Sequence, residues 1–498
     1  MEVEVAQASP EDVEADVLGF VVTEPVELSP LARALDEAVG GRLARLVGDG
    51  EVTGASGEVT VLHAPDGSRV GRLALAGIGA RLDGDADAVR AAAARVVDRV
   101  GGAGARSVAW LLDEDGLALD PHEQARAAVE GVSLGRYDAG RWKTEPNRGA
   151  PLERLVLCGP AAAAVAEEAA RSAVVTAWTN RCRDIVNAPP NELTPEALAA
   201  VGREIADRFP AVRDESLGPS EIEAAGMGAF AAVAQGSHNP PQLIVLNYEP
   251  EGAREDILVG LVGKALTFDA GGLSLKPADG MEEMKSDMGG GAAVLAALGA
   301  IAELELPVRI LAVVPACENM PGGHAYRPGD IVKAASGTTI EITNTDAEGR
   351  LILADALWHA RERGATHVLD LATLTGTISV ALGDFYAGLF SPDEEWRGEI
   401  LAAAGASGDH AWPFPLHATY RRFLDSTFAD LKNCPEKGRG SSIIAALFLE
   451  AFAGAGAWAH LDIAGTAYLD RPRDYYLRPG ATGFGVRLLV ELARRLAA

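Results

Sequence analysis

The chain has 498 residues, of which 48% are hydrophobic and 23% charged, and its formal net charge is −27 at pH 7. This composition is typical of a globular protein and excludes a disordered chain, and the length predicts two domains rather than one core. A strongly acidic surface repels phosphates and anionic lipid, so nucleic-acid binding and membrane-surface binding are both disfavoured.

The amino-terminal segment MEVEVAQASPEDVEAD is acidic and lacks the apolar run of a signal peptide. No apolar stretch is long enough to span a bilayer. The four cysteines are far apart and form no CxxC pair, which favours reduced packing residues over disulfides or a zinc–thiolate site; they are Cys158, Cys182, Cys317 and Cys434. We therefore expect a cytoplasmic protein.

Strand-like and helix-like stretches alternate over the first third of the chain. The predicted strands are 58–64, 71–79, 106–112 and 153–159, and the predicted helices are 85–100 and 122–134. This alternation is typical of a mostly parallel α/β sheet. An Ala-rich helix is then expected over 161–186, ended by Pro189 and Pro190. We expect an amino-terminal domain over 1–164, a connecting helix over 165–186 and a catalytic domain over 187–498.

The second domain restarts at Thr194 and Pro195, which are typical of a helix N-cap followed by proline in the first turn. Apolar runs of the buried-strand type follow over 242–248, 256–268, 308–316, 338–343 and 366–374, with helices predicted over 292–304 and 351–363. This alternation again predicts an α/β domain, the larger of the two.

Acidic and basic residues stand where these apolar strands end. They are Lys264, Asp269, Asp287, Asp346 and Glu348. Sites in open α/β sheets form at the carboxyl ends of strands, so we expect these side chains to converge. Converging carboxylates repel one another, and a pair of divalent cations such as Mg, Mn or Zn would neutralise them. Two such ions can bridge a water, lower its pKa and polarise a carbonyl.

Simpler interpretations exist for each residue alone. Asp287 and Asp346 could be helix N-caps, Lys264 a salt-bridge partner and Arg350 one end of a surface salt bridge. The combination favours a metal site, because four carboxylates, two lysines and an arginine fall within 87 residues of mostly apolar chain.

Other catalytic motifs are missing. The segment GLVGK (260–264) lacks the phosphate-loop spacing, and no GxSxG or HExxH occurs. The histidines form no metal-spaced pair, so we interpret His324, His359 and His460 as structural residues.

Several motifs resemble those of the leucyl aminopeptidase (cytosol aminopeptidase) family, the M17 metallopeptidases. The segment NTDAEGRL (344–351) is similar to the family signature, and VGKALTFDAGGLSLKP (262–277) and MEEMKSDMGGGAAV (281–294) resemble its metal-binding segments. The resemblance covers roughly 180–490 closely. It implies a smaller macro-like α/β domain followed by a larger α/β/α catalytic domain with a mixed, mostly parallel central sheet. It also implies a homohexamer.

The resemblance further implies a role for each residue. Asp269 and Glu348 would bridge two metal ions, Lys264 and Asp287 would complete the tighter site, and Asp346 the more exchangeable one. Lys276 and Arg350 would be the catalytic residues that are not ligands: Lys276 stabilises the oxyanion, and Arg350 holds a bicarbonate that acts as general base. The metals would be Mn or Zn, with Mg or Co as alternatives.

On the substrate side, the resemblance implies an apolar pocket that suits leucine-like residues. Its residues would be Met284, Thr373, Leu374 and Gly376, with Asn344 near the leaving group. Two departures from the family pattern are visible. Ala265 stands where the family usually has glycine, and the segment GRGSSIIAALFLE (438–450) differs from the family's usual sequence at that place. The implied activity is removal of an amino-terminal residue from peptides. The alternatives are a DNA-binding accessory protein and a phosphatase-like two-metal enzyme.

Overall fold

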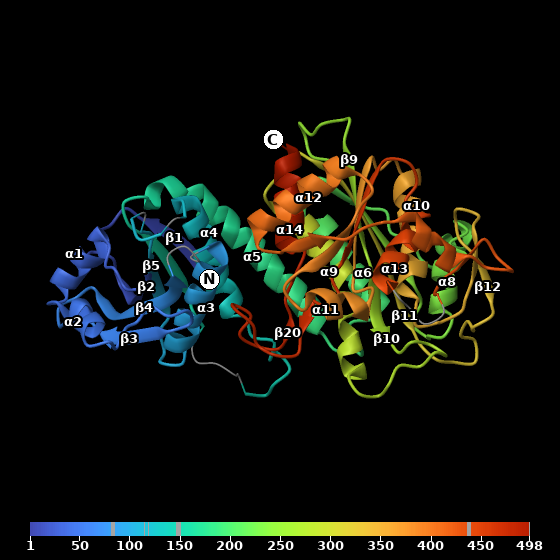
Figure 1. Cartoon of the computed structure of the whole chain (residues 1–498). Coiled ribbons are helices and arrows are strands. Elements are labelled where there is room, and N and C mark those ends of the chain that lie inside the picture. Colours follow the sequence, from blue (N-terminus) through green and yellow to red (C-terminus); the bar gives the residue numbers. More distant parts are fainter. Residues whose placement is uncertain (81–84, 114, 118, 146–150, 436–439, 498) are drawn as a thin grey trace. The chain divides into compact units, whose positions relative to one another are not determined.

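The computed structural model of the chain (Figure 1) describes residues 1–80, 85–113, 115–117, 119–145, 151–435 and 440–497. The chain forms two compact units, each built around an α/β sheet, as the sequence predicts. The first unit contains Met1–Asn180 and Asp470–Pro479, and the second contains Arg181–Leu469 and Gly480–Ala498. Among the described residues, no helix has the length and apolar character needed to cross a membrane.

The first unit contains a six-stranded sheet in the order β1-β6-β5-β2-β4-β3. Its strands are β1 (Glu2–Ala6), β2 (Ala15–Glu24), β3 (Val59–His63), β4 (Val70–Ala80), β5 (Ser107–Leu111) and β6 (Arg154–Cys158), and its helices include α1 (Pro30–Ala38), α2 (Arg42–Gly48), α3 (Ala86–Gly101) and α4 (Pro121–Gly135). All neighbouring strands are parallel except β3 and β4.

Both faces of this sheet are buried, because apolar side chains of its strands point alternately to one face and to the other. In β2, Val17 packs into the cluster that contains α3 and α4, whereas Leu18 packs into the cluster that contains α1 and α2. Successive side chains of a strand point to opposite faces, so a nearly continuous apolar run serves both layers.

Helix α5 (Ala166–Asn187) follows, preceded by a 3-10 turn, η2 (Ala162–Val165). It ends directly before Ala188-Pro189-Pro190, as the two prolines predict. The next helix, α6 (Pro195–Arg208), begins where expected, and the Thr194 hydroxyl accepts the Ala197 N–H at 3.2 Å. Residues 470–479 return to the first unit, where Arg478 Nη2 donates to Asp98 Oδ1 at 3.1 Å.

The central sheet of the second unit has nine strands in the order β16-β15-β18-β14-β9-β11-β8-β7, with β10 paired to β11 beside this path. The strands are β7 (Val212–Asp214), β8 (Gln242–Tyr248), β9 (Leu258–Gly263), β10 (Ala265–Asp269), β11 (Arg309–Asn319), β14 (His367–Ala372), β15 (Ala387–Phe390), β16 (Ala411–Pro413) and β18 (Ala457–Asp462). Strands β9, β10, β11, β14 and β18 run parallel, and β8 runs antiparallel to β11, so the sheet is mixed and mostly parallel.

Helices cover both faces of this sheet. One layer contains α8 (Gly228–Ala234), α10 (Gly349–Glu362) and α13 (Ser441–Glu450), which share one apolar cluster with the strands. Helix α9 (Gly289–Glu303) packs on the same strands and contacts α14 (Val486–Ala497), which in turn contacts α12 (Glu394–Ser407). The short elements are α7 (Pro219–Ala224), α11 (Gly376–Leu382), η3 (Met281–Ser286), η4 (Ala418–Leu424), the sheet of β12 (Ile331–Lys333), β13 (Thr339–Glu341) and β17 (Leu431–Lys432), and the pair β19 (Tyr468–Leu469) and β20 (Gly480–Ala481).

Two predicted strands differ from the structure. The run 256–268 is not one strand, because Lys264 interrupts it and separates β9 from β10. The Lys264 N–H donates to the Leu371 carbonyl, and its own carbonyl accepts the Gly291 N–H, so its backbone leaves the ladder with β11. The run 338–343 is a strand only over Thr339–Glu341, and it belongs to the small β12-β13-β17 sheet rather than to the central one.

Candidate metal centre

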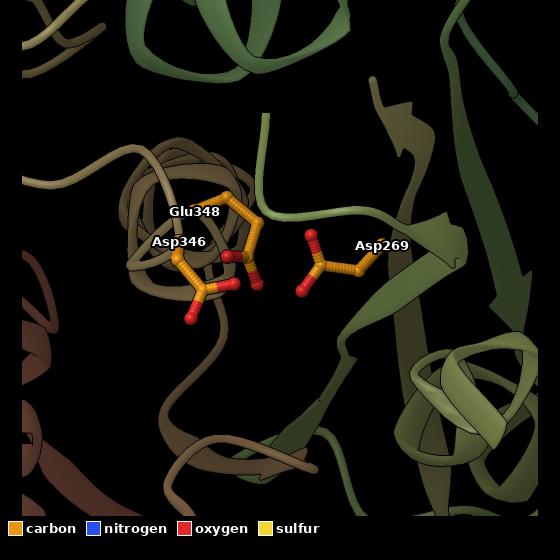
Figure 2. A group of neighbouring side chains, drawn as sticks. All are labelled: Asp269, Asp346 and Glu348. Atoms are coloured by element: carbon orange, nitrogen blue, oxygen red, sulfur yellow. The ribbon is translucent and has the colours of Figure 1, made fainter. Parts of the chain in front are cut away.

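Three acidic side chains from two separate segments converge beside the carboxyl end of β10 (Figure 2). Asp269 is the last residue of β10, whereas Asp346 and Glu348 lie in the segment that joins β13 to α10. One carboxylate oxygen of each residue lies within 4.8 Å of the corresponding oxygens of the other two. Carboxylates this close cannot all ionise without nearby positive charge.

Two lysines contact this cluster, and one of them connects it to Asp287. The Lys264 Nζ lies 2.9 Å from Asp287 Oδ2 and 3.0 Å from Glu348 Oε1. The Lys276 Nζ lies 2.8 Å from Asp269 Oδ2 and 2.6 Å from Asp346 Oδ1. The structure therefore brings together the predicted residues Lys264, Asp269, Lys276, Asp287, Asp346 and Glu348. We call this set the acidic cluster.

The two lysines do not balance the four carboxylates. Burial raises the pKa of Asp269 to about 8, and the charges of Glu348 and Asp287 act in the same direction. Burial also raises the pKa of Asp287 to about 6, against the effect of Lys264, and it raises the pKa of Asp346. Burial alone would raise the pKa of Glu348 as well, but Lys264 and Lys276 outweigh it and hold that pKa below its usual value. A cluster whose carboxyl pKa values are raised in this way lacks positive charge.

The hydrogen bonding of the carboxylate oxygens in the acidic cluster shows whether the cluster suits a metal ion. Within the described part of the chain, Glu348 Oε2 is buried and accepts no hydrogen bond. Asp287 Oδ2 and Asp346 Oδ1 are also buried, and the only partner of each among these residues is a lysine Nζ, at 2.9 and 2.6 Å. Buried carboxylate oxygens are normally hydrogen-bonded, so such atoms require an explanation. Oxygen-rich donor sets suit Mg or Mn, and an added amine also suits Zn. The residues fit divalent cations.

Lys264 differs from the other candidate ligands because an amine must lose its proton before it can bind a metal. Burial acts to lower the pKa of Lys264, but Asp287 and Glu348 outweigh it and raise the pKa above its usual value. A ligand role for this lysine therefore requires that a bound cation displace its proton.

Glycines make room for Lys264 and its neighbour. A Cβ on Gly349 would lie 2.6 Å from the Lys264 Cε, and a Cβ on Gly291 would lie 2.8 Å from the Ala265 Cβ. Ala265 is fully buried, and the glycine at position 291 accommodates the methyl group that departs from the family pattern.

The helix-cap interpretation of the aspartates is wrong. Met288 occupies the N-cap position of α9 and Glu348 that of α10, and neither side chain makes a capping hydrogen bond. The carboxylates of Asp287 and Asp346 therefore do not cap a helix, and they contact the other residues of the acidic cluster instead.

Arg350, in the first turn of α10, does not form the surface salt bridge that was the simpler interpretation of this residue. Its side chain is buried, and its Nη1 donates to the Asn433 carbonyl at 2.9 Å. Its Nε has no hydrogen-bond partner among the described residues. Burial lowers the pKa of Arg350, yet a guanidinium remains protonated at neutral pH. The arrangement leaves an N–H of a buried cation available to an anion.

Two of the predicted substrate-side residues contact the acidic cluster directly. The Thr373 hydroxyl donates to Asp287 Oδ1 at 2.7 Å, and Asn344 Oδ1 accepts the Asp346 N–H at 2.9 Å. Met284 lies on η3 ahead of Asp287, and Leu374 and Gly376 lie where the chain leaves β14 and enters α11.

Sequence reasoning from the residues missed Asn319 and Tyr326. The Asn319 Nδ2 donates to Asp269 Oδ1 at 2.8 Å and to the Thr345 carbonyl at 3.0 Å, and the Tyr326 hydroxyl donates to the same carbonyl at 2.7 Å. Asn319 ends β11, the parallel neighbour of β10, so the strand-end rule that selected Asp269 could have found it.

The three histidines interpreted as structural differ in their surroundings. His460 is fully buried and its Nδ1 lies 2.5 Å from Asp370 Oδ1, whereas burial lowers the pKa of His359 and His324 is exposed. The cysteines are all free, and Cys158, Cys182 and Cys317 are buried.

Comparison with known proteins identifies relatives over nearly the whole chain. Residues 180–490 match the model of the cytosol aminopeptidase family, catalytic domain, and residues 17–146 match that of its N-terminal domain. A probable cytosol aminopeptidase of Solibacter usitatus is 44% identical over 448 residues, which cover 90% of this chain and 92% of the relative. One of Aeromonas salmonicida is 39% identical and covers 99% of this chain and 97% of the relative.

Two solved structures are similar in fold as well as in sequence. A mutant of tomato leucine aminopeptidase has a TM-score of 0.90 and 34% identity, and the match covers 99% of this chain and 96% of that one. The bottromycin maturation enzyme BotP in complex with Mn has a TM-score of 0.85 and 37% identity, covering 97% and 100% of the two chains.

Proposed function

The chain belongs to the M17 cytosol aminopeptidase family of metallopeptidases, and from this premise we propose that it removes the amino-terminal residue of peptides, preferring leucine or another apolar residue. The observation that carries the proposal is the convergence of Asp269, Asp346 and Glu348 from separate segments, together with the buried Glu348 Oε2, which has no hydrogen-bond partner among the described residues.

Each candidate ligand has a place in a two-metal arrangement. By the family resemblance, Asp269 and Glu348 would hold both ions. Lys264 and Asp287, which pair at 2.9 Å, would complete one site, and Asp346 would complete the other. When bound, two divalent ions supply Lewis-acid polarisation of a carbonyl and a water of lowered pKa. Manganese is a reasonable first choice because the related BotP structure is described as a complex with Mn.

Two side chains that are not ligands would handle the charge that develops on the substrate. Carboxylates hold the pKa of Lys276 above its usual value although burial opposes them, so Lys276 stays cationic and can donate to an oxyanion. Arg350 would hold an anion, bicarbonate by the family resemblance, with the Nε–H that has no partner in the part of the chain that the structure describes. An anion held there can accept a proton, which arginine itself cannot do.

The apolar preference rests on Met284 and Leu374, whose side chains suit a leucine-like group. Asn344, Thr373 and Gly376 would border the same site. Assembly as a homohexamer rests on the family resemblance alone. A cytoplasmic location is supported by the names of the relatives, which are called cytosol aminopeptidases.

Hydrolysis of aminoacyl p-nitroanilides with and without Mn²⁺ or Zn²⁺ tests the proposal. We expect leucine p-nitroanilide to be cleaved only with metal, and Asp346→Asn to lose most of that activity. The matched control is Asp393→Asn, which changes the same carboxylate to an amide at the N-cap of α12, where asparagine also caps. Full activity in Asp346→Asn, or hydrolysis of p-nitrophenyl phosphate in place of the anilide, would show that the proposal is wrong.

A further inference from the structure

Asn433 follows the short strand β17 and lies outside the acidic cluster, yet its side chain binds the segment that carries Asp346. Its Oδ1 accepts the Thr343 N–H at 2.9 Å and the Thr343 hydroxyl at 3.2 Å. Its Nδ2 donates to the Asn344 carbonyl at 2.7 Å and reaches the Ala347 carbonyl at 3.4 Å. The side chain is fully buried. One amide therefore fixes both ends of the segment that begins at Thr343 and ends at Ala347.

The backbone of Asn433 reaches a second element of the site. Its carbonyl accepts Arg350 Nη1 at 2.9 Å, which is the hydrogen bond that positions the buried guanidinium. Its N–H donates to the Glu341 carbonyl at 3.0 Å, continuing the parallel pairing of β17 with β13. The small sheet thus places Asn433 between a candidate ligand segment and a candidate catalytic residue.

We propose that Asn433 is a positioning residue that sets the placement of Asp346 relative to Arg350, an inference that rests on the proposed function. The amide is required because the segment presents N–H donors on one side and carbonyl acceptors on the other. An asparagine satisfies both, whereas a carboxylate accepts only and an aliphatic side chain does neither. Of the predicted substrate-side residues, Asn344 is hydrogen-bonded through its backbone to the Asn433 side chain. None of the hydrogen bonds that this side chain makes with the described residues goes to Met284 or Leu374.

Two variants test this role. Asn433→Asp keeps the shape and the acceptor atom but loses both donors, and Asn433→Ala removes the whole amide. Partners behind a metal ligand typically change metal affinity or activity by about 10- to 100-fold. We expect the Mn²⁺ affinity of one of the two sites to fall by about that factor in both variants. We expect kcat to fall as well, with little change in KM for leucine p-nitroanilide.

The matched control is Ser391→Ala, in the same unit but away from the acidic cluster. Ser391 is also buried and donates to the Trp458 carbonyl at 2.6 Å, so its loss costs a buried hydrogen bond without touching the site. We expect it to lower the melting temperature while Mn²⁺ affinity and kcat stay at the wild-type values.

Isothermal titration of metal-free protein with Mn²⁺ measures binding independently of turnover. Wild-type Mn²⁺ affinity and kcat in both Asn433 variants would overturn the proposal. Loss of the fold in both variants, seen by circular dichroism, would overturn it too by assigning Asn433 a purely structural role. If the wild type binds Mn²⁺ but cleaves no aminoacyl substrate, the proposed function fails, while the variant isotherms still decide the role of Asn433. If the wild type binds no Mn²⁺, both proposals fail.

Discussion

Replacing Gly349 with alanine should disturb the acidic cluster through a single methyl group. A Cβ at this position would lie 2.6 Å from the Lys264 Cε and 2.7 Å from its Nζ, whereas ordinary contact begins at 3.4 Å. The end of Lys264 must therefore move by about 0.8 Å. Its Nζ already lies 2.9 Å from Asp287 and 3.0 Å from Glu348, so such a movement separates it from at least one of them.

The size of the effect follows from the sensitivity of catalytic geometry. A misplacement of about 1 Å at a catalytic group can cost about a hundredfold in rate, which corresponds to about 2.7 kcal/mol of transition-state stabilisation. We expect kcat/KM for leucine p-nitroanilide to fall by about 10- to 100-fold. The fold should survive, because alanine is favoured over glycine within a helix by about 1 kcal/mol.

The control is the same exchange where space is open. A Cβ on Gly398, within α12, meets no atom within 4 Å. Gly398→Ala should keep full activity and stabilise the protein by about 0.4–1 kcal/mol. Steady-state kinetics and Mn²⁺ titration of the two variants are the measurements. Wild-type kcat/KM and Mn²⁺ affinity in Gly349→Ala would refute the reasoning.

Three further predictions concern stability. Asp409→Asn should destabilise the second unit by about 3–5 kcal/mol in urea unfolding, because it leaves the buried Arg487 without the carboxylate that lies 2.6 Å from its Nη2; a loss below 1 kcal/mol would contradict this. Gly19→Ala should destabilise the first unit by about 1–3 kcal/mol, because its Cβ would lie 2.9 Å from the Trp110 ring, and kcat should not change. The metal-free protein should lose stability as pH rises from about 4 towards 8, since the pKa of Asp269 is about 8 when folded and near 3.9 when unfolded, so the folded state binds more protons in that window. Melting curves against pH test this, and added Mn²⁺ should remove the slope; a metal-free melting temperature that rises over this range would contradict the assignment.

The sequence predicts both α/β sheets and the helices α3, α4, α5, α6, α9 and α10, because apolar runs and helical periodicity are local signals. It does not predict α1, α2, α7, α8 or the helices after α10. It also predicts the acidic cluster, since Asp269 ends a strand and Asp287, Asp346 and Glu348 occur in recognisable segments. It fails at Lys264, where an apolar run hides a break that depends on hydrogen bonds to Leu371 and Gly291.

Long-range contacts explain the other failures. The stretch 338–343 looks like a buried central strand, but it pairs with β12 just before it and with β17 about 90 residues later, and no local pattern indicates the pairing with β17. The role of Asn433 cannot be predicted from the sequence either. A single asparagine after a two-residue strand is not distinctive, and its partners Thr343 and Asn344 are known only from the structure.

The segment 470–479 has a consequence for how the chain is made on the ribosome. It belongs to the first unit although more than 280 residues of the second unit precede it in the chain. A nascent chain can pair β1 with β6 once residue 158 has emerged, but the Asp98 contact with Arg478 must wait until translation is almost complete. Domains usually fold in order of synthesis, so the first unit is expected to form early and to be finished last. A fragment that stops at Asn180 would therefore lack a piece of its own domain.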